Sequence, residues 1–171
     1  MFPQTGEDIA RLYSGMLTAF EKKEILKYQE VYYLGTVEAK EQRNLKSILT
    51  ARSNSMSQAN NHGFDRNGGL YKVIVGDHIA YRYEVLKDLD KGAFGQVVRC
   101  LDHKTKREVA VKINKCLPSQ HNNTCRAEAA IMQRLRDTVC DNLSSAFYKQ
   151  RIVEYIDHFL FRNHYVSSVK Y

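Results

Sequence analysis

The sequence of 171 residues lacks a hydrophobic run long enough to cross a membrane. No apolar stretch approaches the roughly 20 residues that a membrane-spanning helix needs. The amino terminus, MFPQTGEDIARLY, also lacks the basic start and the apolar core of a secretory signal peptide. We therefore expect an intracellular protein, in the cytoplasm, the nucleus or both. An apolar content of 43% is enough for a modest core in one or two compact units.

Cysteine is also scarce, with only Cys100, Cys116, Cys125 and Cys140 in the chain. In an intracellular protein we expect these to be reduced thiols. Cys116, His121 and Cys125 have spacings similar to those of a zinc knuckle. A structural zinc site needs four ligands, however, and the first C-x-x-C pair is missing, so we expect no bound metal.

Basic residues exceed acidic ones, 26 against 19, and give a net charge of +7. Nucleic-acid binding needs basic residues gathered in a patch, and single strands also need exposed aromatic side chains. Here the basic residues are spread through every segment, and the 11 tyrosines fall largely in apolar patterns such as YQEVYYLG. The charge therefore indicates a solvated surface, and nucleic acid is not an expected partner.

Residues 89–100, LDKGAFGQVVRC, contain Gly92 and Gly95, a spacing that suits either a phosphate-binding loop or a tight turn. The segments QVVRCL and EVAVKIN are rich in strand-forming residues, and the polar HKTKR between them is typical of a hairpin connection. A dinucleotide-binding fold or a P-loop runs from its glycine turn into a helix, whereas a protein kinase runs into a second strand. The order strand, glycine turn, strand therefore favours the kinase arrangement.

The strand EVAVKIN should direct Ala110 and Lys112 to one face and its branched residues to the other. A lysine there can neutralise nucleotide phosphates if a carboxylate on a nearby helix holds its flexible side chain. NNTCRAEAAIMQRLRD predicts that helix, with Glu128 as the only acid in its body and apolar residues at helical spacing, namely Cys125, Ala129, Met132 and Leu135. We predict an ion pair between Lys112 and Glu128.

Each of these residues also has an ordinary structural interpretation. A lysine at a strand end is usually solvated, a helix glutamate usually lies on the surface, and two glycines usually form a tight hairpin. The order and spacing of these residues decide between the structural and the kinase interpretation, because Lys112 follows Gly95 by 17 residues and Glu128 follows Lys112 by 16. This order favours a kinase lobe.

The run GDHIAYRYEVLKDLDKGAFGQVVRCLDHKTKREVAVKINK resembles the start of the catalytic domain of the dual-specificity tyrosine-phosphorylation-regulated (DYRK) kinases, in the CMGC group. DHIAYRYEVL is similar to the short motif before the first kinase strand of that family, and the similarity extends to HFLFRNHY. Upstream, residues 17–35 resemble the accessory segment of the second DYRK class, which packs on the small lobe and assists tyrosine autophosphorylation. The expected fold is thus α+β, a twisted antiparallel sheet with one long helix, preceded by a helical accessory segment.

The resemblance implies ATP as cofactor, with Mg²⁺ in a complete kinase, and protein substrates for the full-length form. It implies that Gly92 and Gly95 place backbone amides over the phosphates, Val97 and Ala110 bracket the adenine, and Lys112 meets the phosphates. Glu128 would orient Lys112. The nucleotide-binding residues expected on this basis are Leu89, Asp90, Lys91, Gly92, Ala93, Phe94, Gly95, Gln96, Val97, Ala110 and Lys112. The family has glycine where this chain has Asp90, and a carboxylate near a triphosphate is unfavourable for ATP binding.

Neither the catalytic His-Arg-Asp nor the metal-binding Asp-Phe-Gly tripeptide of kinases occurs in the 171 residues. Without their aspartates there is no group to orient a substrate hydroxyl and no ligand for magnesium. We therefore expect a small lobe without its large lobe, inactive alone. Two hypotheses remain, an ATP:protein phosphotransferase whose remaining parts lie elsewhere and a non-catalytic module that binds another protein.

We expect three regions, an accessory segment at 1–50, a polar linker at 51–76 and the small lobe at 77–171. Thr5 and Thr18 are each followed three residues later by an acid, the spacing of a capping box, and so predict two helix starts. These helices could pack on each other or on the lobe, and the resemblance favours the lobe. The residues expected to contact the sheet of the small lobe are Phe20, Ile25, Val31 and Tyr33. Residues 51–69 have ten serines, asparagines and glycines in 19 positions, a composition typical of a linker or a disordered insertion.

Overall fold

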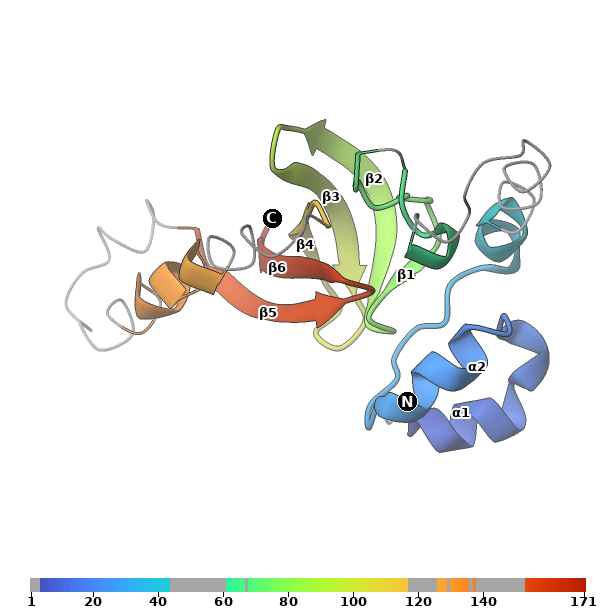
Figure 1. The fold of residues 1–171 in the computed structure, drawn as a ribbon. Helices are drawn as coiled ribbons and strands as arrows, with labels where there is room; N and C mark the ends of the chain where they lie inside the picture. Colours follow the sequence, from blue (N-terminus) through green and yellow to red (C-terminus); the bar gives the residue numbers. More distant parts are fainter. Residues whose placement is uncertain are drawn as a thin grey trace. The chain divides into compact units, whose positions relative to one another are not determined.

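The structure is a computed structural model that describes residues 4–43, 61–66, 68–116, 126–128, 130–135, 137 and 153–171 (Figure 1). The chain forms two compact units, each assembled from three segments. Unit 1 takes residues 1–57, 73–87 and 100–107, and unit 2 takes 58–72, 88–99 and 108–171. None of the helices in the described ranges is long and apolar enough to cross a membrane.

In the described ranges, six strands form one sheet in the hydrogen-bonded order β1-β2-β3-β4-β6-β5. Their bounds are β1 His78–Ile79, β2 Tyr83–Lys91, β3 Gly95–Asp102, β4 Arg107–Asn114, β5 Tyr155–Phe161 and β6 His164–Lys170. The pairs β1–β2, β4–β6 and β5–β6 are antiparallel. The predicted antiparallel sheet is confirmed, and both QVVRCL and EVAVKIN are strands within it.

Strand β4 in unit 2 shows the predicted alternation of burial. Val109, Val111 and Ile113 are 1%, 0% and 1% exposed, so they fill the core face. Ala110 and Lys112 are half-buried on the other face. The branched side chains favour an extended backbone and occupy one side of it, which leaves the lysine on the side where its charged end can reach solvent.

The hairpin between β5 and β6 turns at Arg162 and Asn163, whose φ angles are 47° and 67°. Two consecutive left-handed residues are typical of the two-residue turn that matches the twist of antiparallel strands. Arg162 is a costly residue in this conformation, but its guanidinium carbon lies 3.9 Å from the ring centre of Phe64 and 4.6 Å from that of Phe161. These contacts help to hold the turn.

Part of the predicted linker packs on the strands of unit 2. Phe64 and Tyr71 are 5% and 2% exposed. The buried ring of His164 hydrogen-bonds both to the Asn114 carbonyl and to an Asp65 carboxylate oxygen, each at 2.7 Å. Asp65 is therefore tied to β6 through His164, although composition alone indicated a segment with little to bury. The boundaries 1–50, 51–76 and 77–171 stay predictions.

The amino-terminal helices belong to unit 1 and begin where the threonines predict. They are α1 Gly6–Leu12, the 3-10 helix Ser14–Met16, α2 Glu21–Glu24 and the 3-10 helix Ile25–Lys27. The Thr5 hydroxyl accepts the Asp8 backbone N–H at 3.2 Å. Thr18 and Glu21 form both reciprocal hydrogen bonds of a capping box, at 2.8 and 3.2 Å. Residues 37–43 form a further helical segment.

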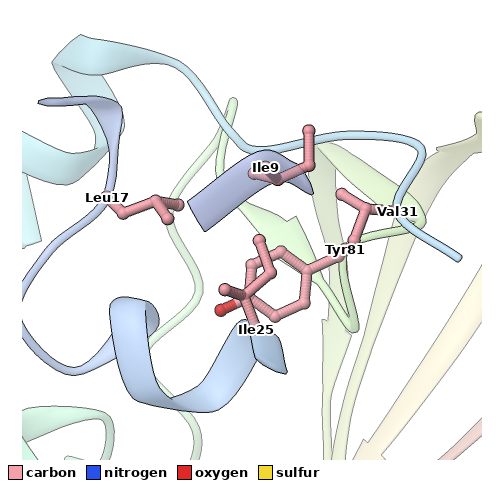
Figure 2. Packing of buried hydrophobic residues seen from close by; sticks show 5 residues of the cluster. All are labelled: Ile9, Leu17, Ile25, Val31 and Tyr81. Carbon is pink, nitrogen blue, oxygen red and sulfur yellow. The ribbon is translucent and has the colours of Figure 1, made fainter. Parts of the chain in front are cut away.

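A small hydrophobic core joins these helices to the segment between β1 and β2 (Figure 2). Its members come from α1, from the residue after the first 3-10 helix, from the second 3-10 helix, from residue 31 and from the β1–β2 connection, and are Ile9, Leu17, Ile25, Val31 and Tyr81. Tyr81 and Ile25 are fully buried. Ile25 and Val31 pack in this core with Tyr81, and contact of residues 17–35 with the sheet itself stays a prediction. Tyr33 donates a hydrogen bond of 2.9 Å to the Gly76 carbonyl.

Candidate functional site

The glycine hairpin lies between β2 and β3, where the Gly92 N–H donates to the Gly95 carbonyl at 2.8 Å. A Cβ atom at Gly95 would overlap the Ile113 carbonyl and lie 2.9 Å from the Asn114 Cα, so this glycine permits close packing on β4. A Cβ atom at Gly92 would meet nothing within 4 Å. Packing on β4 therefore explains Gly95, whereas the space around Gly92 would accept a side chain.

A pocket of about 200 Å³ lies in unit 2, and its lining includes Val97, Ala110, Lys112 and Glu128. Val97 on β3 and Ala110 on β4 provide small apolar surface, and Lys112 and Glu128 provide opposite charges. Such a combination of apolar wall and a few polar groups is typical of a small-molecule site. The fold thus brings together four residues that the sequence analysis identified separately.

The Lys112 ammonium and the Glu128 carboxylate form a hydrogen-bonded ion pair. This pairing is the one that the sequence predicts. The two side chains are 34% and 47% exposed, so water screens their attraction and the pair contributes little to stability by itself. The ion pair instead matters for geometry, because it fixes the position of the flexible Lys112 side chain.

No described residue of the pocket forms a cluster of metal ligands. Elsewhere, in unit 1, one oxygen or nitrogen atom each of Glu21, Asp77 and His78 lie within 4.8 Å of one another. Their oxygen atoms already have partners, since Glu21 accepts from Lys40 at 2.9 Å and contacts His78 at 2.9 Å, and Asp77 pairs with Arg43. This cluster is a buried network of charges that cancel, and it does not need a metal ion.

The charge network affects the acidity of Glu21. Burial alone would raise its pKa, but the hydrogen bond with His78 and the positive charge of Lys40 outweigh burial and hold the pKa well below its usual value. Glu21 therefore remains ionised, which keeps the network intact.

The two cysteines among the described residues are free. Burial, together with the negative charge of Glu84, raises the pKa of the Cys100 thiol far above its usual value. Burial and Asp65 also raise the pKa of Cys116. Both thiols are therefore protonated and poorly reactive. Cys125, Cys140 and the zinc-knuckle candidate His121 lie outside the described residues.

No family model matches the chain. The DYRK-family kinase pom1 of Schizosaccharomyces pombe is 37% identical over 95% of the chain, and the dual specificity tyrosine-phosphorylation-regulated kinase mbk-2 of Caenorhabditis elegans is 37% identical over 92%. Human dual specificity tyrosine-phosphorylation-regulated kinase 4 is 37% identical over 94%. The chain is a homologue of the DYRK-family protein kinases. It spans only 13%, 17% and 28% of the length of these three relatives.

The homology confirms the predicted resemblance, and the six-stranded sheet with its glycine hairpin confirms the fold of a kinase small lobe. Nearly the whole chain aligns with the pom1 kinase. The relatives are named as kinases.

The predicted nucleotide-binding residues occupy different environments. Val97, Ala110 and Lys112 line the pocket together with the predicted orienting residue, Glu128. Most residues of the hairpin are exposed and are not among the lining residues, namely Leu89, Asp90, Lys91, Gly92, Ala93 and Phe94. Their contact with a nucleotide stays a prediction, as do the roles of the other residues.

Two predicted residues interact with the protein itself. Gln96 is buried, and its side-chain amide donates to the Tyr71 carbonyl, so this side chain is already engaged within the protein. The Asp90 carboxylate accepts the Lys91 backbone N–H at 2.8 Å. The Lys91 ammonium lies 2.5 Å from a carboxylate oxygen of Asp88. The Lys91 ammonium thus balances the charge of Asp88 and not that of Asp90.

The sequence did not identify the part of the pocket that β6 provides. Tyr165 and Ser167 both line it. Ser167 lies directly opposite Lys112 in the antiparallel pairing, and Tyr165 is two residues earlier on the same face. The alternation of HYVSSVK could have indicated a shared face, but the register that places this face beside Lys112 depends on tertiary structure.

Proposed function

We propose that this chain forms the ATP-binding small lobe of a DYRK-like protein kinase that phosphorylates serine and threonine and autophosphorylates on tyrosine. The observation on which this rests is the Lys112–Glu128 ion pair in a pocket that is also lined by Val97 on β3, the strand that follows the glycine turn. A lysine held by a helix carboxylate behind such a hairpin is the arrangement by which kinases position the phosphates of ATP.

The residues present fit ATP at the level of individual groups. The open space at Gly92 would let a phosphate approach the backbone amides of the hairpin. Val97 and Ala110 would contact the adenine, and the Lys112 ammonium would neutralise phosphate charge while Glu128 holds it. ATP would supply the phosphoryl group, with Mg²⁺ to balance its charge. The other residues of the hairpin, including Asp90, would lie along the phosphates.

We further propose that the 171 residues alone do not transfer phosphate to protein substrates. Transfer needs a carboxylate to orient the acceptor hydroxyl and carboxylates to bind Mg²⁺, and kinases draw these from His-Arg-Asp and Asp-Phe-Gly segments that do not occur in this sequence. A large lobe would complete the site. The proposal includes an intracellular location, in the cytoplasm, the nucleus or both, where ATP is available.

The test compares the 171-residue chain with the same chain fused in frame to a DYRK-type large lobe. Each is incubated with radiolabelled ATP, magnesium and a general protein substrate. We expect incorporation only by the fusion, and we expect Lys112→Met to reduce it by orders of magnitude. Lys106→Met is the matched control, because Lys106 is exposed in the turn between β3 and β4.

The outcomes separate the two parts of the proposal. Incorporation by the unfused chain that depends on Lys112 would show that the 171 residues are active alone. A fusion that folds but transfers no phosphate, or loses no activity with Lys112→Met, would contradict the kinase assignment itself.

A second candidate function is a non-catalytic module that binds another protein. One observation favours it, because Leu12, Tyr13 and Met16 in and after α1 are 59%, 39% and 39% exposed although they continue the apolar face of Ile9. The two candidates depend on different residues. The test measures ATP affinity and binding of a purified partner for a Lys112 variant and for a variant with polar residues at 12, 13 and 16. In a kinase lobe the Lys112 variant loses ATP binding and the second variant keeps it. In a binding module the second variant loses the partner and the Lys112 variant keeps it.

A further inference from the structure

The helix that contains Glu128 has little apolar packing among its described residues. Of residues 126–128, 130–135 and 137, only Met132 is half-buried and all others are exposed. Ile131 and Leu135 are 59% and 40% exposed. Most helices in proteins are held by an apolar face packed on a core, and this source of stability is weak here. The described polar contacts of the helix therefore matter more than usual.

Two polar contacts connect this helix to neighbouring strands. Glu128 pairs with Lys112 on β4. Arg126, two residues earlier, donates a hydrogen bond from Nε to the Tyr165 hydroxyl on β6, at 2.8 Å. The guanidinium carbon of Arg126 also lies 6.0 Å from the centre of the Tyr165 ring. The hydrogen bond has a charged donor, which makes it stronger than a bond between neutral groups.

The two strand residues lie on one face of the sheet. Lys112 is directly opposite Ser167 in the β4–β6 register. Tyr165 precedes Ser167 by two residues, so its side chain leaves β6 on the same face as the side chains of Ser167 and Lys112. All three residues line the pocket. The helix is thus bound to two adjacent strands at one side of a single cavity.

The two helix residues lie on opposite sides of the helix axis. Side chains two residues apart on an α-helix point about 200° apart, because each residue turns the helix by about 100°. A rotation that brings residue 126 toward the sheet moves residue 128 away from it. Both contacts can therefore form together only within a narrow range of helix orientations.

We propose that the hydrogen bond from Arg126 to Tyr165 is a second tether of this helix and that it positions Glu128 for its ion pair with Lys112. Arg126 and Tyr165 are then positioning residues, which act on a nucleotide only through Glu128. The relevance of the tether to ATP rests on the proposed function, but its effect on the ion pair does not. Because the pair is half-exposed and weak in water, its population is sensitive to the loss of a neighbouring contact.

The test observes Lys112 directly, in the full 171-residue chain without nucleotide. Reductive methylation with ¹³C labels the lysines and keeps their charge, and Lys112→Arg identifies the Lys112 signal in the NMR spectrum. Glu128→Gln gives the reference signal of an unpaired Lys112. We expect Tyr165→Phe to shift the Lys112 signal toward this reference, because the ratio of paired to unpaired Lys112 should fall by about two- to tenfold.

Three further variants make the test specific. Arg126→Gln should reproduce the shift from an exposed position, and it serves as the test if Tyr165→Phe does not fold. In the Glu128→Gln background Tyr165→Phe should leave the signal unchanged, because the two changes act on one interaction. Tyr171→Phe is the matched control and should have no effect, since Tyr171 is 61% exposed and its ring centre lies 5.8 Å from the Arg99 guanidinium carbon, away from Arg126 and Glu128 in the sequence.

A Lys112 signal that is identical in folded Tyr165→Phe and wild-type protein would overturn the tether, as would an equal shift in the Glu128→Gln background. Measuring the ATP affinity of the same variants distinguishes a failure of this proposal from a failure of the proposed function. If the signal shifts as expected but wild-type protein binds no ATP, the tether stands and the nucleotide site fails. If ATP binding depends on Lys112 but the signal does not respond to Tyr165→Phe, the nucleotide site stands and the tether fails.

Discussion

The two glycines of the hairpin should respond in opposite ways to the same substitution. At Gly95 the added Cβ of alanine overlaps the Ile113 carbonyl and lies 2.9 Å from the Asn114 Cα, so backbone atoms of two strands must move. Overpacking of this kind costs about 1–3 kcal/mol. At Gly92 the added atom meets nothing within 4 Å, and its backbone is not left-handed.

Comparison of the two variants isolates the steric cost. Replacing glycine by alanine restricts the unfolded chain, which stabilises a protein by about 0.4–1 kcal/mol where the native backbone accepts alanine. This contribution is common to both positions and cancels in the difference. We therefore expect the free energy of unfolding of Gly95→Ala to lie about 1–3 kcal/mol below that of Gly92→Ala.

The assay is urea unfolding of the 171-residue chain and of both variants, with ATP affinity measured by calorimetry on the folded proteins. Gly92→Ala should keep wild-type stability or exceed it, and should weaken ATP binding if phosphates approach the backbone there. Equal stability of the two variants would refute the close-packing role of Gly95. A stable Gly92→Ala variant with unchanged ATP affinity would refute the phosphate-binding role of Gly92.

Three further predictions concern unit 1. Ile25→Ala should lower the free energy of unfolding by about 2–5 kcal/mol because Ile25 is fully buried in the core cluster, whereas Leu26→Ala, at a side chain that is 54% exposed, should change it by less than about 0.5 kcal/mol in the same urea titration. Burial raises the pKa of Asp102, but hydrogen bonds from Arg82, from a threonine hydroxyl and from a backbone N–H outweigh burial and lower the pKa. The stabilising contribution of Asp102 should therefore be complete above the unfolded pKa of about 3.9 and be lost as pH falls through the folded pKa. Asp102→Asn should remove this part of the pH dependence of the free energy of unfolding. Deletion of residues 1–50 should expose Tyr81, which the core cluster buries, and lower the thermal midpoint or the solubility of the remainder; no change in either would show that the segment is independent of it.

Much of the candidate site was predictable from local sequence. Period-two alternation in EVAVKIN is enough to separate Lys112 from Val111, and helical spacing places Glu128 on a helix. Thr18 and Glu21 predict their own capping box because its hydrogen bonds connect residues three positions apart. These features depend on near neighbours in the chain, so no knowledge of the tertiary fold is needed to infer them.

Other parts of the structure depend on contacts between residues distant in sequence. Composition described residues 51–69 as polar, but Phe64 packs beside Tyr71, and Asp65 reaches His164, which is 99 residues away. The buried network of Glu21, Lys40 and His78 also joins distant segments. Single charged residues have no periodic pattern that would identify their partners, so the sequence offered no signal for either arrangement.

The sequence by itself determined the strands, the glycine hairpin and the capped helices, because each follows from backbone preference and side-chain alternation over a few positions. Only the tertiary structure decided that Ser167 lies opposite Lys112, that the Tyr165 hydroxyl accepts a hydrogen bond from Arg126, and that Gly95 is needed for packing on β4. Strand register and helix orientation are set by the packing of whole surfaces against one another, and a shift of one residue in β6 would place a different set of side chains beside the same lysine.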